Sequence, residues 1–184
     1  GDIATRLSDQ PLPPDGVRLV TEEFEADGVV FNEDGVKVTA FEVDHGQTIK
    51  PAFGYRVDYG GRSVTMSGDT TIHPNVIKYG AGTDLLIHEV AMVRPELNDN
   101  KTAQIIMSHH ASPKQAAEVF ALTNPKLAIY THVLFIAMNG VPAATLEDII
   151  ADTKAHYDGR FEIGEDLMSF EIDDVVKLHR WVGR

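Results

Sequence analysis

The chain has 184 residues, of which 43% are hydrophobic, and a formal net charge of -12 at pH 7. It is long enough to bury a core, and its acidic balance disfavours broad electrostatic binding of nucleic acid or anionic lipid, which depends on clustered Lys and Arg. The absence of cysteine excludes disulfides, thiolate metal ligands and cysteine nucleophiles. It does not fix the compartment, for which the cytoplasm is favoured, and no membrane association is expected.

The first part of the chain is predicted to form antiparallel strands. The segment from Asp2 to Leu7 has the character of a helix end, and the alternation of apolar and polar residues over 17–24 predicts a strand. Two hairpins should follow, because similar alternation flanks short turns at Asp34-Gly35 and Gly60-Gly61. Their strands are expected at 29–31 and 36–43, and at 55–59 and 63–66.

The rest of the chain predicts an α/β fold. Continuous apolar runs at 84–87 and 127–130 suit buried strands. Between them, the residues Ser112-Pro113-Lys114-Gln115 form a helix start with a capping box, and Asn124-Pro125 marks the helix end. Further elements are expected downstream: a helix over 145–157, and a pair of strands formed by 161–163 and 168–172.

Three polar residues lie at the ends of apolar, strand-like runs: His45, Asp69 and His132. Each has an ordinary explanation by itself, since a histidine at a strand end can bond to the backbone and Asp69 can cap a helical turn at Pro74. Together they favour a metal site, because strand ends of a layered α/β protein meet at one edge and divalent cations take imidazole nitrogen and carboxylate oxygen.

Six motifs extend in order over most of the chain: Val-Asp-His-Gly (43–46), Pro-Ala-Phe-Gly-Tyr-Arg-Val (51–57), Ser-Gly-Asp-Thr (67–70), Asp-Leu-Leu-Ile-His-Glu (84–89), His-His-Ala-Ser-Pro-Lys-Gln-Ala-Ala (109–117) and Tyr-Thr-His (130–132). Their order and spacing resemble the metallo-β-lactamase superfamily, in its branch of ribonuclease Z and arylsulfatase-like metallohydrolases. The resemblance implies an α/β fold of the αββα sandwich type. It also implies an early His-x-His-x-Asp-His loop that this sequence lacks. We therefore expect residues 1–184 to be the C-terminal portion of one such domain.

The resemblance also implies how two metal ions are held. His45 would bind one ion, His132 the other, and Asp69 would bridge them. Zn²⁺ is favoured by the ligand types, with Mn²⁺ or iron as alternatives. Each ion would have only two protein ligands, fewer than tight zinc sites have. The isolated chain is therefore expected to bind metal weakly or not at all, and to be inactive.

Glu89 and His110 match a proton-transfer pair in the ribonuclease Z-like members. Together with Asp69 they are the predicted catalytic residues. A carboxylate beside an imidazole raises its pKa, whereas the helix start at Pro113 lowers it, and we expect Glu89 to dominate if the two side chains touch. In the ordinary alternative, Glu89 caps a local loop and His110 merely precedes a helix. His109 is ambiguous, and His88 is expected to be structural.

The implied activity is hydrolysis of an ester by a metal-bound hydroxide. Only 24 positions separate His45 from Asp69, too few for the long arm with which the common bacterial ribonuclease Z grips transfer RNA. This interval and the acidic balance favour a small phosphate, sulfate or carboxylic ester as substrate and make nucleic acid an unlikely partner. The alternatives are a ribonuclease Z-type enzyme that processes tRNA 3′ ends, and a non-catalytic binding scaffold. A homo-oligomer is a further possibility, because half of a fold would expose apolar faces.

Overall fold

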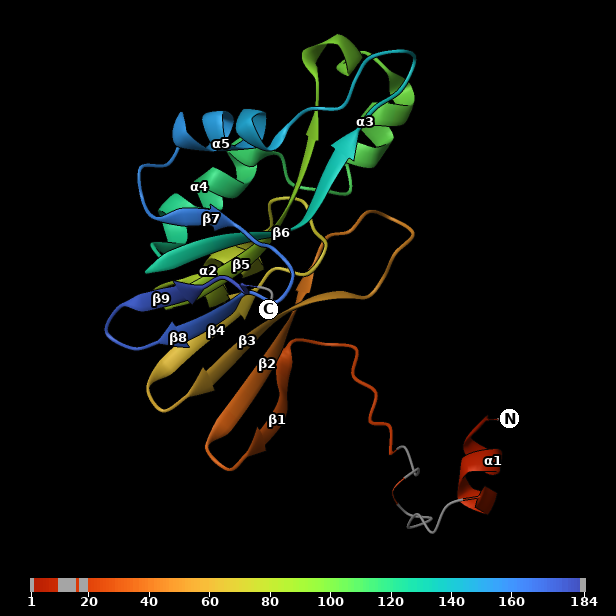
Figure 1. The fold of residues 1–184 in the computed structure, drawn as a ribbon, viewed down its shortest axis with the longest axis vertical. Coiled ribbons are helices and arrows are strands. Elements are labelled where there is room, and N and C mark those ends of the chain that lie inside the picture. Colours follow the sequence, from red (N-terminus) through yellow and green to blue (C-terminus); the bar gives the residue numbers. More distant parts are fainter. Residues whose placement is uncertain (1, 10–15, 17–19, 183–184) are drawn as a thin grey trace.

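The computed structural model describes residues 2–9, 16 and 20–182. A mixed sheet of seven strands runs through it in the order β1-β2-β3-β4-β5-β6-β7 (Figure 1). The strands are β1 (Gly28–Glu33), β2 (Val36–Val43), β3 (Ala52–Tyr59), β4 (Arg62–Met66), β5 (Leu85–Val93), β6 (Leu127–Ile136) and β7 (Phe161–Ile163). The first four strands pair antiparallel, and β4 to β7 pair in parallel.

Both predicted hairpins are confirmed. The turn between β1 and β2 places Asp34 and Gly35 at φ 50° and 80°, and the turn between β3 and β4 places Gly60 and Gly61 at φ 56° and 76°. Two successive residues at positive φ give a turn whose twist matches that of the flanking strands, which is why glycine and aspartate occur there.

The prediction of a strand over 17–24 is wrong for residues 20–24. Residues 17–19 lie outside the described residues, and residues 20–24 form no strand and have exposed side chains. The alternation in this segment therefore has no neighbouring strand to pair with in the described part of the chain. Alternation indicates which side chains could share a face, but a strand also needs a partner for its backbone groups.

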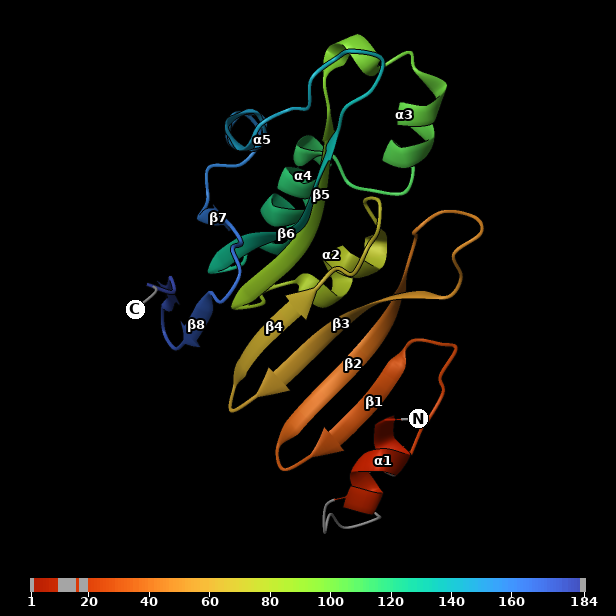
Figure 2. The same cartoon turned by 45° about the vertical axis from the view of Figure 1, so that its right-hand side comes forward.

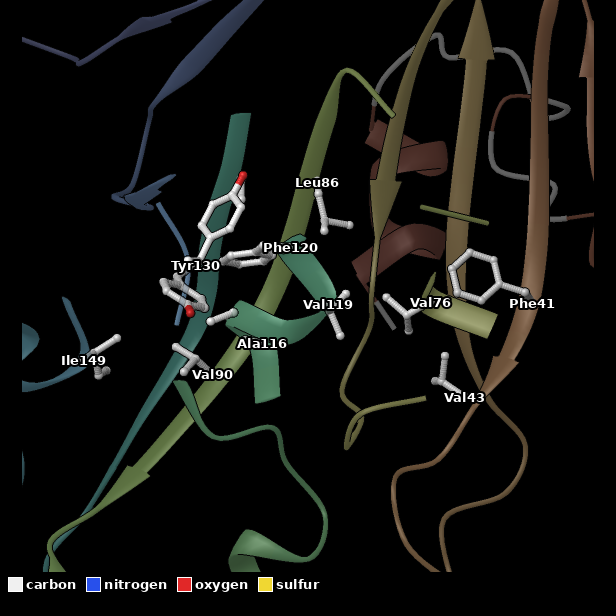
Figure 3. Packing of buried hydrophobic residues seen from close by; sticks show 13 residues of the cluster. Phe41, Val43, Val76, Leu86, Val90, Ala116, Val119, Phe120, Tyr130 and Ile149 are labelled. Atoms are coloured by element: carbon white, nitrogen blue, oxygen red, sulfur yellow. The ribbon is translucent and has the colours of Figure 1, made fainter. Parts of the chain in front are cut away.

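The helices are α1 (Asp2–Asp9), α2 (Pro74–Gly80), α3 (Lys101–Met107), α4 (Pro113–Thr123) and α5 (Leu146–Lys154), with a short 3-10 turn η2 (Pro95–Leu97). The main core lies between one face of the sheet and the helices α2, α4 and α5 (Figure 3). Phe41 of β2, Leu86 of β5 and Tyr130 of β6 meet Val76 of α2 and Phe120 of α4 there. This layer fixes the strands whose ends carry the predicted site.

The helix α4 begins and ends as its sequence predicts. The Ser112 hydroxyl accepts a hydrogen bond from the Gln115 amide at 3.3 Å, and the Gln115 side-chain oxygen accepts one from the Ser112 amide at 2.9 Å. At the other end, Asn124 takes the left-handed conformation with φ 48°. The capping box satisfies amide groups that have no partner inside the helix, so α4 starts at a defined residue, Pro113, three positions after His110.

The end of the chain differs from its prediction. The segments 161–163 and 168–172 do not pair with each other: β7 joins the main sheet parallel to β6, and β8 (Ser169–Ile172) pairs with β9 (Val176–His179). Phe161 of β7 packs against the main core, whereas Phe170 of β8 packs on the opposite face of the sheet with Val176 of β9. The two segments thus face different cores, which local alternation could not reveal.

The strands β5 and β6 are longer than predicted and continue past their neighbours. They carry η2 and α3 on an extension beside the main sheet (Figure 2). This extension has its own apolar cluster, in which Leu97 and Ala103 pack with Ile136 of β6. In the described part of the chain, the helices are too short or too polar for any of them to cross a membrane.

Candidate metal centre

The structure brings His45, Asp69 and His132 together at one edge of the sheet. His45 follows β2, Asp69 follows β4, and His132 lies in β6. One carboxylate oxygen of Asp69, Oδ2, is 3.8 Å from His45 Nε2 and 3.7 Å from His132 Nε2. We call these three side chains the outer group, because the side chains of Asp69 and His132 are 41% and 48% exposed.

His45 is oriented by a backbone group. Its Nδ1 atom is 3.0 Å from the backbone oxygen of His109, and because a carbonyl only accepts hydrogen bonds, Nδ1 carries the hydrogen. In the neutral ring, Nε2 then presents a lone pair toward the Asp69 carboxylate. Two electron-rich atoms that face each other at 3.8 Å suit a cation between them, and a backbone carbonyl on the other ring nitrogen is typical of metal-ligating histidines.

The loops that carry His45 and Asp69 are joined by hydrogen bonds. The Asp44 amide donates to the Thr70 hydroxyl at 3.1 Å, and the Thr71 amide donates to the Asp44 carbonyl at 2.9 Å. Asp69 itself caps no helix, since the side chain of His73 accepts the amide of Asn75 at the start of α2. The ordinary alternative for Asp69 is therefore excluded, and the Asp69 side chain faces the two imidazoles.

Glycine is required directly before Asp69. Gly68 has φ 64°, and a Cβ atom there would lie 2.4 Å from the backbone oxygen of Phe53. Gly46, directly after His45, has φ 89°, and a Cβ atom there would lie 2.7 Å from the ring of His109. Both positions combine a left-handed backbone with a close approach, so a larger residue at either would displace the adjacent predicted ligand.

His132 occupies a β-bulge. Thr131 pairs with Glu89 and Val133 pairs with Val90, so His132 is the extra residue between two regular stretches of the β5·β6 ladder. Its φ of 44° lies in the left-handed region that a non-glycine residue rarely adopts. A bulge re-aims one side chain without changing the strands on either side of it. Here it turns the His132 side chain toward the edge that carries Asp69.

Glu89 and His110 form a second, buried pair, which we call the inner pair. Glu89 Oε2 is 3.2 Å from His110 Nδ1, and Glu89 Oε1 accepts the Ala111 amide at 2.7 Å. The Glu89 side chain is 1% exposed, and burial is the main cause that raises its pKa to about 8, against the lowering effect of the Ala111 amide. Glu89 thus accepts a hydrogen bond from the loop backbone, as expected if it only caps a local loop, and it also contacts His110.

The expectation that Glu89 raises the pKa of His110 is wrong. The pKa of His110 is lowered, first by burial and then by the neighbouring His45. The two side chains do touch, but a glutamic acid that keeps its proton near neutral pH supplies no negative charge to stabilise an imidazolium. The sequence could not reveal this, because the burial of Glu89 depends on elements far apart in the chain.

Residues of the inner pair lie close enough to the outer group to bind the same metal ion. Possible ligand atoms of Glu89, His110 and His132 all lie within 4.8 Å of one another. The ring of His110 stacks on that of His132 at 5.6 Å between centres and meets that of His45 edge-on at 5.2 Å. Because both oxygens of Glu89 already have partners, the outer group offers the freer donors. The contributing backbone groups, the His109 carbonyl and the Ala111 amide, have no sequence signal, since every residue type carries them.

Comparison with known proteins shows the family of the chain. The sequence profile of the beta-lactamase superfamily domain matches residues 3–133. Ribonuclease Z of Mycobacterium avium (strain 104) is 31% identical over 178 residues, which are 94% of this chain and 60% of that protein. Ribonuclease Z of Mycolicibacterium gilvum (strain PYR-GCK) is 31% identical over 163 residues, 87% of this chain and 53% of that protein. The chain thus spans 60% or less of the length of these relatives.

Solved structures share the fold. The metallo-beta-lactamase fold protein YhfI from Bacillus subtilis has a TM-score of 0.58 at 16% identity, covering 77% of this chain and 52% of that one. Human tRNase Z, short form, has a TM-score of 0.54 at 22% identity, covering 81% of this chain and 48% of that one. The predicted α/β class and the predicted superfamily are therefore confirmed.

The relatives correct the predicted partners. The expectation that nucleic acid is an unlikely partner and a small ester the substrate is wrong, because the matching curated relatives are ribonucleases Z. The net charge misled because it sums acidic residues over the whole chain, including the exposed Glu22, Glu23 and Glu25 that precede the sheet. The short interval from His45 to Asp69 excludes one kind of RNA-gripping arm and not RNA itself.

The fold family implies a divalent metal, and the donor set at the sheet edge fits one. Imidazole nitrogens and a carboxylate oxygen converge there within 3.8 Å, with one imidazole already held in the tautomer that presents a lone pair. The profile match over residues 3–133, together with this fold, shows that the chain belongs to the beta-lactamase superfamily.

Proposed function

We propose that this chain belongs to a ribonuclease Z-type endoribonuclease, which hydrolyses a phosphodiester bond in precursor tRNA at the 3′ end. The observation that carries the proposal is the similarity to ribonuclease Z along 94% of the chain. The edge with His45, Asp69 and His132 supports it, because phosphodiester hydrolysis needs charge stabilisation and a proton donor at one place. A cation held by the outer group would supply the first, and the inner pair would supply the second.

The outer group would hold the metal, with Asp69 between the imidazoles of His45 and His132. Zn²⁺ is our proposal for the ion, since two histidines and a carboxylate suit it, and Mn²⁺ or iron would also accept these donors. A divalent cation bound there supplies a positive charge that polarises the phosphoryl group and activates water. The carbonyl of His109 and the bulge at His132 keep the two imidazoles aimed at Asp69.

The inner pair would move the proton that the leaving group needs. The 3.2 Å contact lets the Glu89 carboxyl donate to His110 Nδ1, so the hydrogen of the neutral imidazole lies on Nε2. His110 would give that hydrogen to the departing ribose oxygen and take the proton of Glu89 at Nδ1. The products of the transfer are a neutral imidazole, a carboxylate and an alcohol, so one proton has moved along the pair.

Local positive charge supports an RNA substrate despite the acidic total. Lys50 is exposed on the loop that also carries His45, and Lys114 is exposed on the first turn of α4, which follows His110. Phosphates interact mainly with charges within a Debye length of about 8 Å at physiological salt. We therefore propose Lys50 and Lys114 as contacts of the RNA phosphates.

The test uses the protein at its natural length. It is incubated with Zn²⁺ or Mn²⁺ and three substrates: precursor tRNA with a 3′ trailer, an aryl phosphodiester and an aryl sulfate. We expect cleavage of the trailer, and loss of that cleavage in Asp69→Ala. Hydrolysis of the aryl sulfate in preference to the RNA, or metal-independent cleavage, would refute the proposal.

A further inference from the structure

His88 lies on β5 directly before Glu89, and its side chain is fully buried. It faces the helix layer, where its ring meets that of Phe120 edge-on at 6.0 Å between centres. Its Nε2 atom has no hydrogen-bond partner among the described residues. A buried unpaired nitrogen costs free energy that an apolar side chain of similar size would avoid. If this imidazole stabilises the structure through a hydrogen bond, that bond must involve its other ring nitrogen, Nδ1.

That other nitrogen contacts the backbone of the inner pair. His88 Nδ1 is 2.7 Å from the backbone oxygen of Glu89. Because the carbonyl only accepts, Nδ1 carries the hydrogen and donates it, and Nε2 keeps its lone pair. Burial lowers the pKa of His88 to about 4, so this neutral form persists at neutral pH.

The bonded carbonyl lies where the strand pairing changes register. Glu89 is the last β5 residue before the shift, since it pairs with Thr131 whereas Val90 pairs with Val133. A bulge disrupts the ladder locally and leaves backbone groups that need other partners. On the far side of the shift, the Ala91 amide donates to the Ala111 oxygen at 2.9 Å. The β5 strand is thus held by contacts outside the β5·β6 ladder on both sides of the bulge.

We propose that His88 is a positioning residue, which holds the Glu89 carbonyl at the start of the bulge and thereby sets both the Glu89 carboxyl and His132 in place. Glu89 has its backbone bonded to His88 on the helix side and its carboxyl bonded to Ala111 and His110 on the loop side. A rotation of its backbone would move both ends. It would also remove the geometry that keeps His132 in the left-handed conformation.

Two substitutions distinguish the effect of the His88 hydrogen bond from the effect of the packing of its ring. His88→Phe keeps a ring against Phe120 but has no donor. His88→Asn is smaller, and its side-chain amide can donate from the position of Nδ1. Tyr130→Phe is a matched control, since it removes another buried hydrogen bond, to Thr153 at 2.9 Å, from the neighbouring strand. His88→Leu replaces His88→Phe if the larger side chain prevents folding.

The first measurement is amide hydrogen exchange of the metal-free chain. In His88→Phe, the amides of 90–93 and 133–136 should exchange about tenfold faster relative to those of 38–42 in β2, as the loss of one buried bond predicts. In His88→Asn the same ratio should stay within about threefold of the unsubstituted chain. A uniform change in both regions, as expected for Tyr130→Phe, would overturn the proposal. Equal effects of His88→Phe and His88→Asn would overturn it as well.

The second measurement is zinc affinity at natural length, and this part rests on the proposed function. His88→Phe should weaken zinc binding about tenfold, the lower end of the usual effect of residues that orient metal ligands, while His88→Asn should not. Unchanged zinc affinity in His88→Phe would refute the link to His132. Failure of the unsubstituted protein to cleave RNA would refute the proposed function and leave the exchange result standing.

Discussion

The outer group and the inner pair lie at the same sheet edge and differ in what satisfies their polar atoms. In the outer group, Asp69 Oδ2 lies 3.8 Å from His45 Nε2 and 3.7 Å from His132 Nε2, both beyond hydrogen-bond distance. In the inner pair, the carboxyl of Glu89 has a partner on each oxygen and keeps its proton. The inner pair thus has its hydrogen-bond partners within the protein, whereas the outer group is where we propose that a cation binds.

The largest expected effect comes from removing the shared carboxylate. Asp69→Ala should lower zinc affinity at least about 100-fold and abolish RNA cleavage, because it deletes the only anionic donor of the outer group. Isothermal titration with Zn²⁺ and the trailer assay would measure both. Asp173→Ala is the control, since that exposed carboxylate pairs with Arg62 in a contact that involves no residue of the site. If Asp69→Ala retained zinc, the outer group would not be the metal site.

Substitution in the inner pair should separate rate from metal binding. His110→Gln is expected to keep zinc affinity and to lower kcat by a factor of about 100 to 10,000, the usual range for loss of a general acid. His156→Gln, at an exposed histidine that pairs with Asp152, serves as control. Equal loss of zinc in His110→Gln and Asp69→Ala would mean that His110 is a ligand, as its position within 4.8 Å of His132 allows.

The protonated state of Glu89 predicts a pH dependence of stability. Its folded pKa of about 8 lies above the ordinary value of 4.5, so the folded chain holds a proton that the unfolded chain loses, and stability falls as pH rises from 4.5 to 8. The lowered pKa values of His88 and His110 act only below their ordinary value of 6.5.

Between pH 6.5 and 8, therefore, the metal-free chain should lose about 2 kcal/mol of unfolding free energy through Glu89. Glu89→Gln should lose none of it over the same range. Urea denaturation in the presence of EDTA would give the difference. Parallel curves for the two proteins would show that Glu89 is ionised at neutral pH.

The smallest effect is expected at the bulge. His132→Asn should raise the free energy of unfolding by up to about 1 kcal/mol in the metal-free chain, because asparagine tolerates positive φ better than histidine does. The same substitution should weaken zinc binding. Thr131→Asn, one residue earlier in a regular strand position, should instead destabilise the chain, since asparagine is unfavourable in strands. Similar effects at both positions would argue against strain at His132.

The sequence predicts best the features that depend on neighbouring residues. The hairpin turns at Asp34-Gly35 and Gly60-Gly61, and the capping box at Ser112, need only a few adjacent residues, and the structure has them all. The strands β5 and β6 were predicted to end at 87 and 130, whereas they continue to 93 and 136. Glu89 and His132 interrupt the apolar runs. The apolar pattern therefore does not show that the two strands continue beyond these residues.

For the site itself, the sequence predicted which side chains meet and not their charge states. His45 and Asp69 could be placed at one edge because β2 and β4 run in the same direction and both end there, whereas His132 reaches this edge from a bulge inside β6. The neutral state of the inner pair could not be predicted, because it results from the packing of β5 under the loop of Ala111. The pairing of β8 with β9 was missed for a related reason, since it depends on which face of the sheet needs cover.

The bulge in β6 has a consequence for how the proposed metal site could be lost. Val133 to Ile136 already pair with Val90 to Val93, and this pairing does not use His132. Deleting that single residue would leave an uninterrupted strand with every later side chain on its present face, whereas deleting Tyr130 or Val133 would invert part of the strand. The in-frame loss of this one codon would thus remove a proposed metal ligand and leave the strand pairing intact.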